Sequence, residues 1–137
     1  DIANFFKKEM GYEIPPMTPF VGSAFNMTRA GVHADGMMKD TEIYNIFDTE
    51  KILKRPAEVS ISNTSGLAGI AYWINKHFKL PEEKMVGKQD WIVQEMKKQI
   101  DALYADGRTT VMGEDELVTI FRALSKDGRC ALNWFEL

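Results

Sequence analysis

The chain has little or nothing of several features that would assign a protein to a class at once. Its only cysteine is Cys130, so no disulfide can form within the chain, and we expect a reducing, cytoplasmic location. No apolar run approaches the roughly 20 residues that span a bilayer. Basic residues number 17 against 20 acidic ones. This argues against binding to nucleic acid or to an anionic membrane, because both need a surplus of positive charge.

The start of the chain, its histidine content and its Asp-Gly pairs indicate further what kind of protein this is. The chain begins at Asp1 without an apolar signal segment, and from the missing Met we expect a piece of a longer protein. His33 and His77 are its only histidines, so it cannot supply a multi-histidine metal site. Two Asp-Gly pairs, at 106–107 and 127–128, lack the carboxylates that a calcium loop needs at both ends. We therefore expect no metal site within the chain.

Apolar residues recur at helical spacing along much of the sequence. The composition, 45% hydrophobic and 27% charged, is ordinary for a folded protein. Val59 and Ile61 alternate with serines and predict one brief strand. The predicted fold class is mainly α with a little β. The predicted helices span 2–10, 64–78, 90–107 and 113–128. Two short helical turns, capped near residues 40 and 48, are predicted in addition.

Prolines suggest how the chain is divided. Three of them between residues 15 and 19 prevent a helix there. The helix before them is too short to be stable alone, so we interpret 1–17 as the end of a helix from a preceding unit, followed by a linker. Leu80-Pro81 ends the middle section. We predict a small subdomain over 18–80 and a helical subdomain over 81–137.

Two segments are candidates for chemistry. His33 lies near Asp35 between two glycines, and such a histidine can act as a general base if it lines a cleft; the alternative is a solvated loop histidine. Ser65 and Gly66 precede a helix, whose free amides could hold a phosphate or carboxylate. The alternative there is helix capping and close packing. His77, at a helix end, has the simpler interpretation of a structural residue.

Several stretches together resemble a known family. These are the sequences PFVGSAF at 19–25, AGVHADGMMK at 30–39 and YNIFD at 44–48, followed by a helix start within 59–70. They resemble the region after the catalytic barrel in the 2-isopropylmalate synthase and homocitrate synthase family. The resemblance covers 18–80 and extends to 1–17. Residues 81–137 correspond only to an expected helical subdomain.

The resemblance implies a condensation of acetyl-CoA with a 2-oxo acid. A divalent metal (Mg²⁺, Mn²⁺ or Zn²⁺) would be bound by a TIM barrel that this chain lacks. The region after the barrel would form a lid over the barrel of a second subunit in a homodimer. His33 and Tyr44 would complete that active site as catalytic residues, and Asp35 could orient His33 or serve only as a capping or surface residue. The chain alone would be inactive.

The resemblance leaves the oxo acid open. Family members commonly carry a histidine shortly after the Ala-Phe pair, where this chain has Asn26 and its neighbours. 2-Oxoisovalerate, 2-oxoglutarate and oxaloacetate therefore all stay possible as substrates. The rival interpretation is a non-catalytic helical module that senses a ligand at Ser65-Gly66 or mediates dimerisation.

Overall fold

The structure of the chain, a computed structural model, describes residues 2–28, 33, 35–36 and 46–126. The predicted turn near residue 40, Tyr44, the predicted helix end at Gly128 and Cys130 lie outside the described residues. Within the described part the class is confirmed as mainly helical with one small sheet. No helix in that part is long and apolar enough to cross a membrane. In chain order the elements are α1 (Ile2–Glu9), β1 (Met27–Thr28), α3 (Thr49–Leu53), β2 (Glu58–Val59), α4 (Leu67–His77), the 3₁₀ helix η2 (Glu82–Lys84), α5 (Trp91–Ala105) and α6 (Glu114–Ser125).

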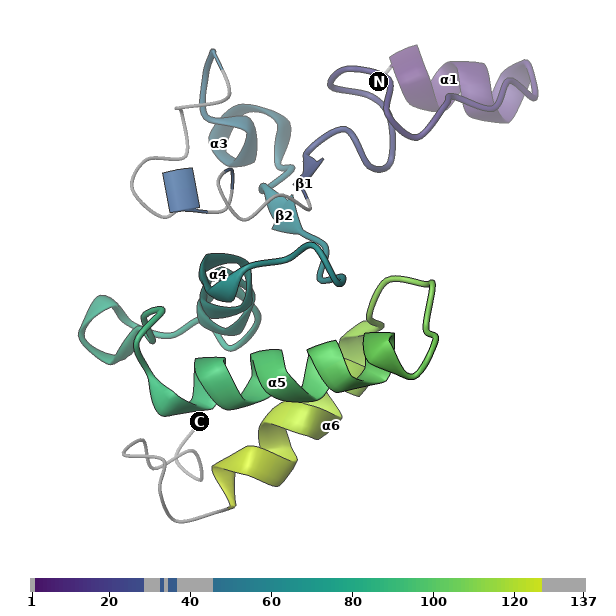
Figure 1. The fold of residues 1–137 in the computed structure, drawn as a ribbon. Helices are drawn as coiled ribbons and strands as arrows, with labels where there is room; N and C mark the ends of the chain where they lie inside the picture. The colour runs from purple at the N-terminus through teal and green to yellow at the C-terminus, as the bar shows by residue number, and fades with distance from the viewer. Residues whose placement is uncertain (1, 29–32, 34, 37–45, 127–137) are drawn as a thin grey trace.

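Helix α4 is the centre of the fold (Figure 1). The small sheet lies on one side of α4, helix α5 packs on it from another, and α6 packs on α5. Because α4 has neighbours on several sides, more of it is buried than a single apolar stripe would predict, including the polar Asn75. The main core cluster runs from Ile61 before α4 to Leu124 in α6. It therefore includes residues from both sides of the predicted subdomain boundary at residue 80.

The helices form close to where their sequences predict them. Helix α5 follows Asp90 as expected. Its apolar spacing predicts one buried face made of Ile92, Met96, Gln99, Ile100 and Leu103. Ile92, Met96 and Ile100 are buried as predicted, Leu103 is exposed, and Val93 is buried in addition. Helix α6 buries Leu117 and Phe121 as predicted. A ring contact between Phe121 and Phe78, with centroids 4.5 Å apart, joins α6 to the end of α4.

The small sheet is parallel and pairs segments that are far apart in the sequence. Met27 pairs with Glu58, and Thr28 with Val59. The strand predicted over 59–62 is therefore displaced toward its N-terminal side, where β1 offers partners for its backbone. Arg55 reinforces this region, because its guanidinium donates to the carbonyl of Gly22 at 2.6 Å.

Helix α1 stands apart from the α4–α6 core (Figure 1) and buries none of its residues. It ends before Gly11, which takes the left-handed conformation with φ +62°. The chain then folds back on itself at Gly22, where a side chain would meet the Pro16 carbonyl at 2.2 Å, so only glycine fits there. The apolar residues of the predicted α1 stripe are exposed to solvent: Ile2, Phe5, Phe6 and Met10.

Candidate functional site

His33 lies on an exposed helical turn beside the sheet. Its ring nitrogen Nδ1 is 3.4 Å from the hydroxyl oxygen of Thr28 in β1. A partner on one ring nitrogen restricts the orientation and tautomer of an imidazole. The exposed ring therefore has a preferred orientation relative to the sheet.

Asp35 lies two positions after His33, and its partner differs from that of His33. Its carboxylate forms an ion pair with the ammonium group of Lys88, which lies just before α5. The structure therefore connects the His33 turn to the helical part of the chain. Sequence reasoning did not identify Lys88, because no spacing pattern links it to residue 35.

The other predicted site residues are Tyr44, Ser65 and Gly66. Tyr44 lies outside the described residues. Ser65 is buried, and its hydroxyl donates to the Ser60 carbonyl at 3.2 Å and accepts from the Ser62 amide at 3.0 Å. Gly66 is the N-cap of α4 and is partly buried. The contacts of Ser65 are those expected of a residue that shapes the turn into the helix, and anion binding by the amides after it stays a prediction.

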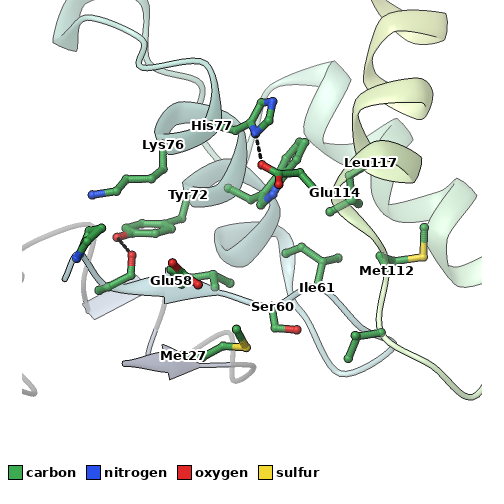
Figure 2. A pocket seen from close by; sticks show the side chains of 15 residues that line it. Met27, Glu58, Ser60, Ile61, Tyr72, Lys76, His77, Met112, Glu114 and Leu117 are labelled. Atoms are coloured by element: carbon green, nitrogen blue, oxygen red, sulfur yellow. Dashed lines mark hydrogen bonds and ion pairs between the residues drawn. The ribbon is translucent and has the colours of Figure 1, made fainter. Parts of the chain in front are cut away.

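An open groove of about 640 Å³ lies between β2, the C-terminal half of α4 and the start of α6 (Figure 2). Tyr72 lies along it and donates from its hydroxyl to the Ala57 carbonyl at 3.3 Å. Burial raises the pKa of this phenol above its ordinary value of 10.0. Tyr72 therefore stays neutral and acts as a hydrogen-bond donor at physiological pH. The described residues that form the apolar part of the lining include Met27, Val59, Ile61, Trp73, Met112 and Leu117.

Three ionisable residues of the groove lining, Lys76, His77 and Glu114, take part in ion pairs. His77 Nδ1 is 2.7 Å from the Glu114 carboxylate, and the His77 ring stacks on Trp73 with centroids 4.8 Å apart. Figure 2 shows the His77–Glu114 contact at one side of the groove. Lys76 reaches Glu50 of α3 at 3.1 Å. The structural interpretation of His77 fits these contacts, since the ring links α4 to α6.

The predicted site residues that the structure describes lie outside the groove. Among the residues that the structure describes, neither His33 nor Ser65 nor Gly66 contributes to the lining. The spacing of Trp73 and His77, one helical turn apart, could have predicted their stacking. Nothing in the sequence indicates that Glu114 would meet His77.

The described residues do not fit a metal ion. Across residues 2–28, 33, 35–36 and 46–126, no three His, Cys, Asp or Glu side chains gather as ligands. Zinc sites in proteins take three or four such side chains, and calcium sites take several carboxylates.

Comparisons with known proteins add to this geometry. No family model matches the chain. Over 117 residues, 85% of the chain, it is 52% identical to a citrate (Re)-synthase of Clostridium kluyveri and 54% identical to a citrate (Re)-synthase of Syntrophus aciditrophicus. It is 30% identical over 97 residues, 71% of the chain, to a 2-isopropylmalate synthase of Thermus thermophilus.

These relatives are much longer than the region of similarity. The matched region spans 26% of the Clostridium kluyveri protein, 19% of the Syntrophus aciditrophicus protein and 27% of the Thermus thermophilus protein. The similarity nevertheless covers most of this chain. More than half of the aligned residues are identical to those of two proteins that are both named citrate (Re)-synthase. By its sequence the chain belongs, as a segment, to the family that includes the citrate (Re)-synthases and the 2-isopropylmalate synthases.

Proposed function

We propose that the chain is part of a synthase that condenses acetyl-CoA with a 2-oxo acid, and that the oxo acid is oxaloacetate. The family membership supports the reaction class. The choice of oxo acid is supported by identities of 52% and 54% to two citrate (Re)-synthases, against 30% to a 2-isopropylmalate synthase. Citrate is the product expected when the methyl carbon of acetyl-CoA joins the ketone carbon of oxaloacetate.

The reaction places two demands on the protein. A base must remove a proton from the weakly acidic methyl group, and the oxygen of the attacked ketone must be stabilised as it gains negative charge. The new carbon–carbon bond forms as the ketone becomes an alcohol by taking up a proton. Water then cleaves the thioester and releases CoA.

His33 is the residue of this chain that we assign to proton transfer. The observation that carries the assignment is the exposure of its ring on a turn oriented by Thr28. An imidazole at the surface can enter the active site of another domain or subunit, whereas one buried in its own core cannot. We propose that His33 takes or relays the methyl proton, and that Tyr44, assigned from the sequence, donates a hydrogen bond to a substrate oxygen.

The remaining assignments concern the arrangement of the whole synthase. We propose that residues 1–17 continue from a barrel, that 18–80 act as a lid over a second subunit, and that 81–137 form the helical subdomain. A lid excludes water from the reacting atoms until both substrates are bound. The divalent metal would be held by parts of the synthase other than the described residues, since these gather no ligand set. Anion binding at Ser65-Gly66 and the cytoplasmic location stay predictions.

The test is an assay of the complete synthase with a panel of 2-oxo acids. With acetyl-CoA and a divalent metal, we expect CoA release with oxaloacetate at a kcat/KM well above that with 2-oxoisovalerate or 2-oxoglutarate. A preference for one of the other two would retain the reaction class and refute the proposed substrate. Absence of CoA release with any 2-oxo acid would refute the condensation itself.

A further inference from the structure

The loop that carries Lys88 is fastened to α4 and to the start of α5. The Asn75 side chain donates to the Val86 carbonyl at 2.9 Å and accepts from the Val86 amide at 2.8 Å. Val86 itself lies in the main core. Further along, the Gly87 amide donates to the Asp90 carboxylate at 2.6 Å. Lys88 therefore projects from a short segment whose backbone is held on both sides.

Lys88 reaches from this loop to the His33 turn. Its ammonium group pairs with the Asp35 carboxylate, whose side chain is only 27% exposed. A charge that is partly withdrawn from water interacts more strongly with its partner than a fully solvated one does. Since Asp35 lies two positions after His33 in the same helical turn, a contact at Asp35 restricts where the imidazole can be.

The contacts that hold His33 and Asp35 in place come from the sheet and from the helical part of the chain. Thr28 contacts the ring from the sheet, and Lys88 holds the backbone turn from the helical part of the chain. A catalytic group needs such support, because a displacement of about 1 Å can lower the rate by up to about 100-fold.

We propose that Lys88 is a positioning residue for His33 and acts through Asp35. The proposal rests on the proposed role of His33 in the synthase. An ion pair at the surface contributes little to global stability. The loss of Lys88 should therefore be seen in turnover and much less in the unfolding temperature.

The first experiment replaces Lys88 in the complete synthase. We expect Lys88→Met to lower kcat about tenfold, with KM for the oxo acid within about twofold of the wild type because Lys88 acts on the base. Lys88→Arg should restore most of the loss, since it keeps the charge and nearly the reach. The matched control is Lys84→Met, which removes an exposed lysine from η2 on the same connection and should leave kcat unchanged.

A second experiment separates this inference from the proposed function. In a His33→Ala background, Lys88→Met should cause no further loss, because there is no imidazole left to position. Suppose that His33→Ala lowers turnover, but that Lys88→Met causes no loss in the wild type, or causes the same loss in the wild type and in the His33→Ala variant. The positioning role of Lys88 is then refuted, and the role of His33 stands. If His33→Ala itself leaves turnover unchanged, the role of His33 and the positioning role of Lys88 are both refuted. Should Lys88→Met fail to fold, Lys88→Gln provides the same comparison.

Discussion

The two histidines of the chain lie in opposite surroundings. His33 is exposed and has Thr28 against one ring nitrogen, whereas His77 is stacked on Trp73 and paired with Glu114. The contacts of His77 all belong to the chain's own fold and join two of its helices. The same residue type therefore has a structural role at one position, while at the other it is the exposed imidazole that we assign to proton transfer.

The contrast leads to a prediction for the complete synthase. His33→Ala should lower kcat by roughly 10²–10⁴, the usual loss when a general base is removed. The measurement is CoA release at saturating acetyl-CoA and oxo acid. His77→Gln is the matched control, because it removes the other imidazole and should leave kcat near the wild-type value. Equal losses in the two variants would contradict the assignment.

At the scale of elements, the sequence predicts what depends on local periodicity. Helices α4, α5 and α6 lie close to where their apolar spacing places them, although α4 begins after Gly66 and not after residue 64. Asp48 caps α3 by accepting from the Lys51 amide at 3.0 Å. The pairing of β1 with β2 could not be predicted, since two-residue strands carry no usable alternation. The Asp35–Lys88 pair could not be predicted either, because a contact between surface side chains that are far apart in the chain leaves no periodic pattern in the sequence.

The packing of α6 leads to a stability prediction. Phe121 is 2% exposed and stacks on Phe78. Phe121→Ala should lower the free energy of unfolding by about 3–5 kcal/mol, because it leaves a cavity at the α4–α6 junction. Leu103→Ala, on the exposed side of α5, should change it by about 0.5 kcal/mol or less. Urea denaturation of the chain measures both, and similar losses would mean that α6 is not part of the cooperative core.

The contacts at the N-terminal end of α6 lead to a prediction about how stability depends on pH. Arg108 donates to both carboxylate oxygens of Glu116 at 2.7 Å, and the Gly113 amide donates to one of them at 2.7 Å. These hydrogen bonds, the one from Arg108 foremost, lower the pKa of Glu116 from 4.5 to about 2. Because the folded-state pKa is the lower one, the stabilisation is complete above about pH 4.5 and is lost as the pH falls toward 2.

Glu116→Gln should therefore lower the unfolding temperature above pH 4.5 and have progressively less effect as the pH approaches 2. Thermal unfolding followed between pH 2 and pH 7 measures this difference. Glu83→Gln, an exposed position in η2, is the matched control and should show no such convergence with the wild type. A constant difference at all pH values would indicate that the charge of Glu116 is not what stabilises the start of α6.

At the scale of the whole molecule, the described residues include a well-packed region and a helix, α1, that is exposed. The core from Ile61 to Leu124 is continuous, whereas α1 presents its apolar residues to solvent. This arrangement agrees with the proposal that the chain operates within a larger synthase. It also supports the assignment of α1 to the preceding barrel, as expected from its length and its amphipathic sequence.

A prediction at this scale concerns the chain by itself. With acetyl-CoA, oxaloacetate and added Mg²⁺, Mn²⁺ or Zn²⁺, it should release no CoA above the rate of spontaneous hydrolysis. The described residues gather no metal-ligand set and offer one exposed imidazole, which is too little for the condensation. A thiol-reactive dye detects released CoA, and the complete synthase is the positive control. Robust CoA release by the chain would contradict the requirement for the rest of the protein.

The central place of α4 also has a consequence for biosynthesis. Translation proceeds from the N-terminus, so α4 leaves the ribosome before α5 and α6, the helices that complete its core. Until about residue 105 has emerged from the exit tunnel, Ile70 and Ile74 lack the apolar partners that α5 provides. Chaperones that bind nascent apolar segments would therefore find a target in α4 during this interval, and the native packing of α4 has to wait for the last helix of the described chain.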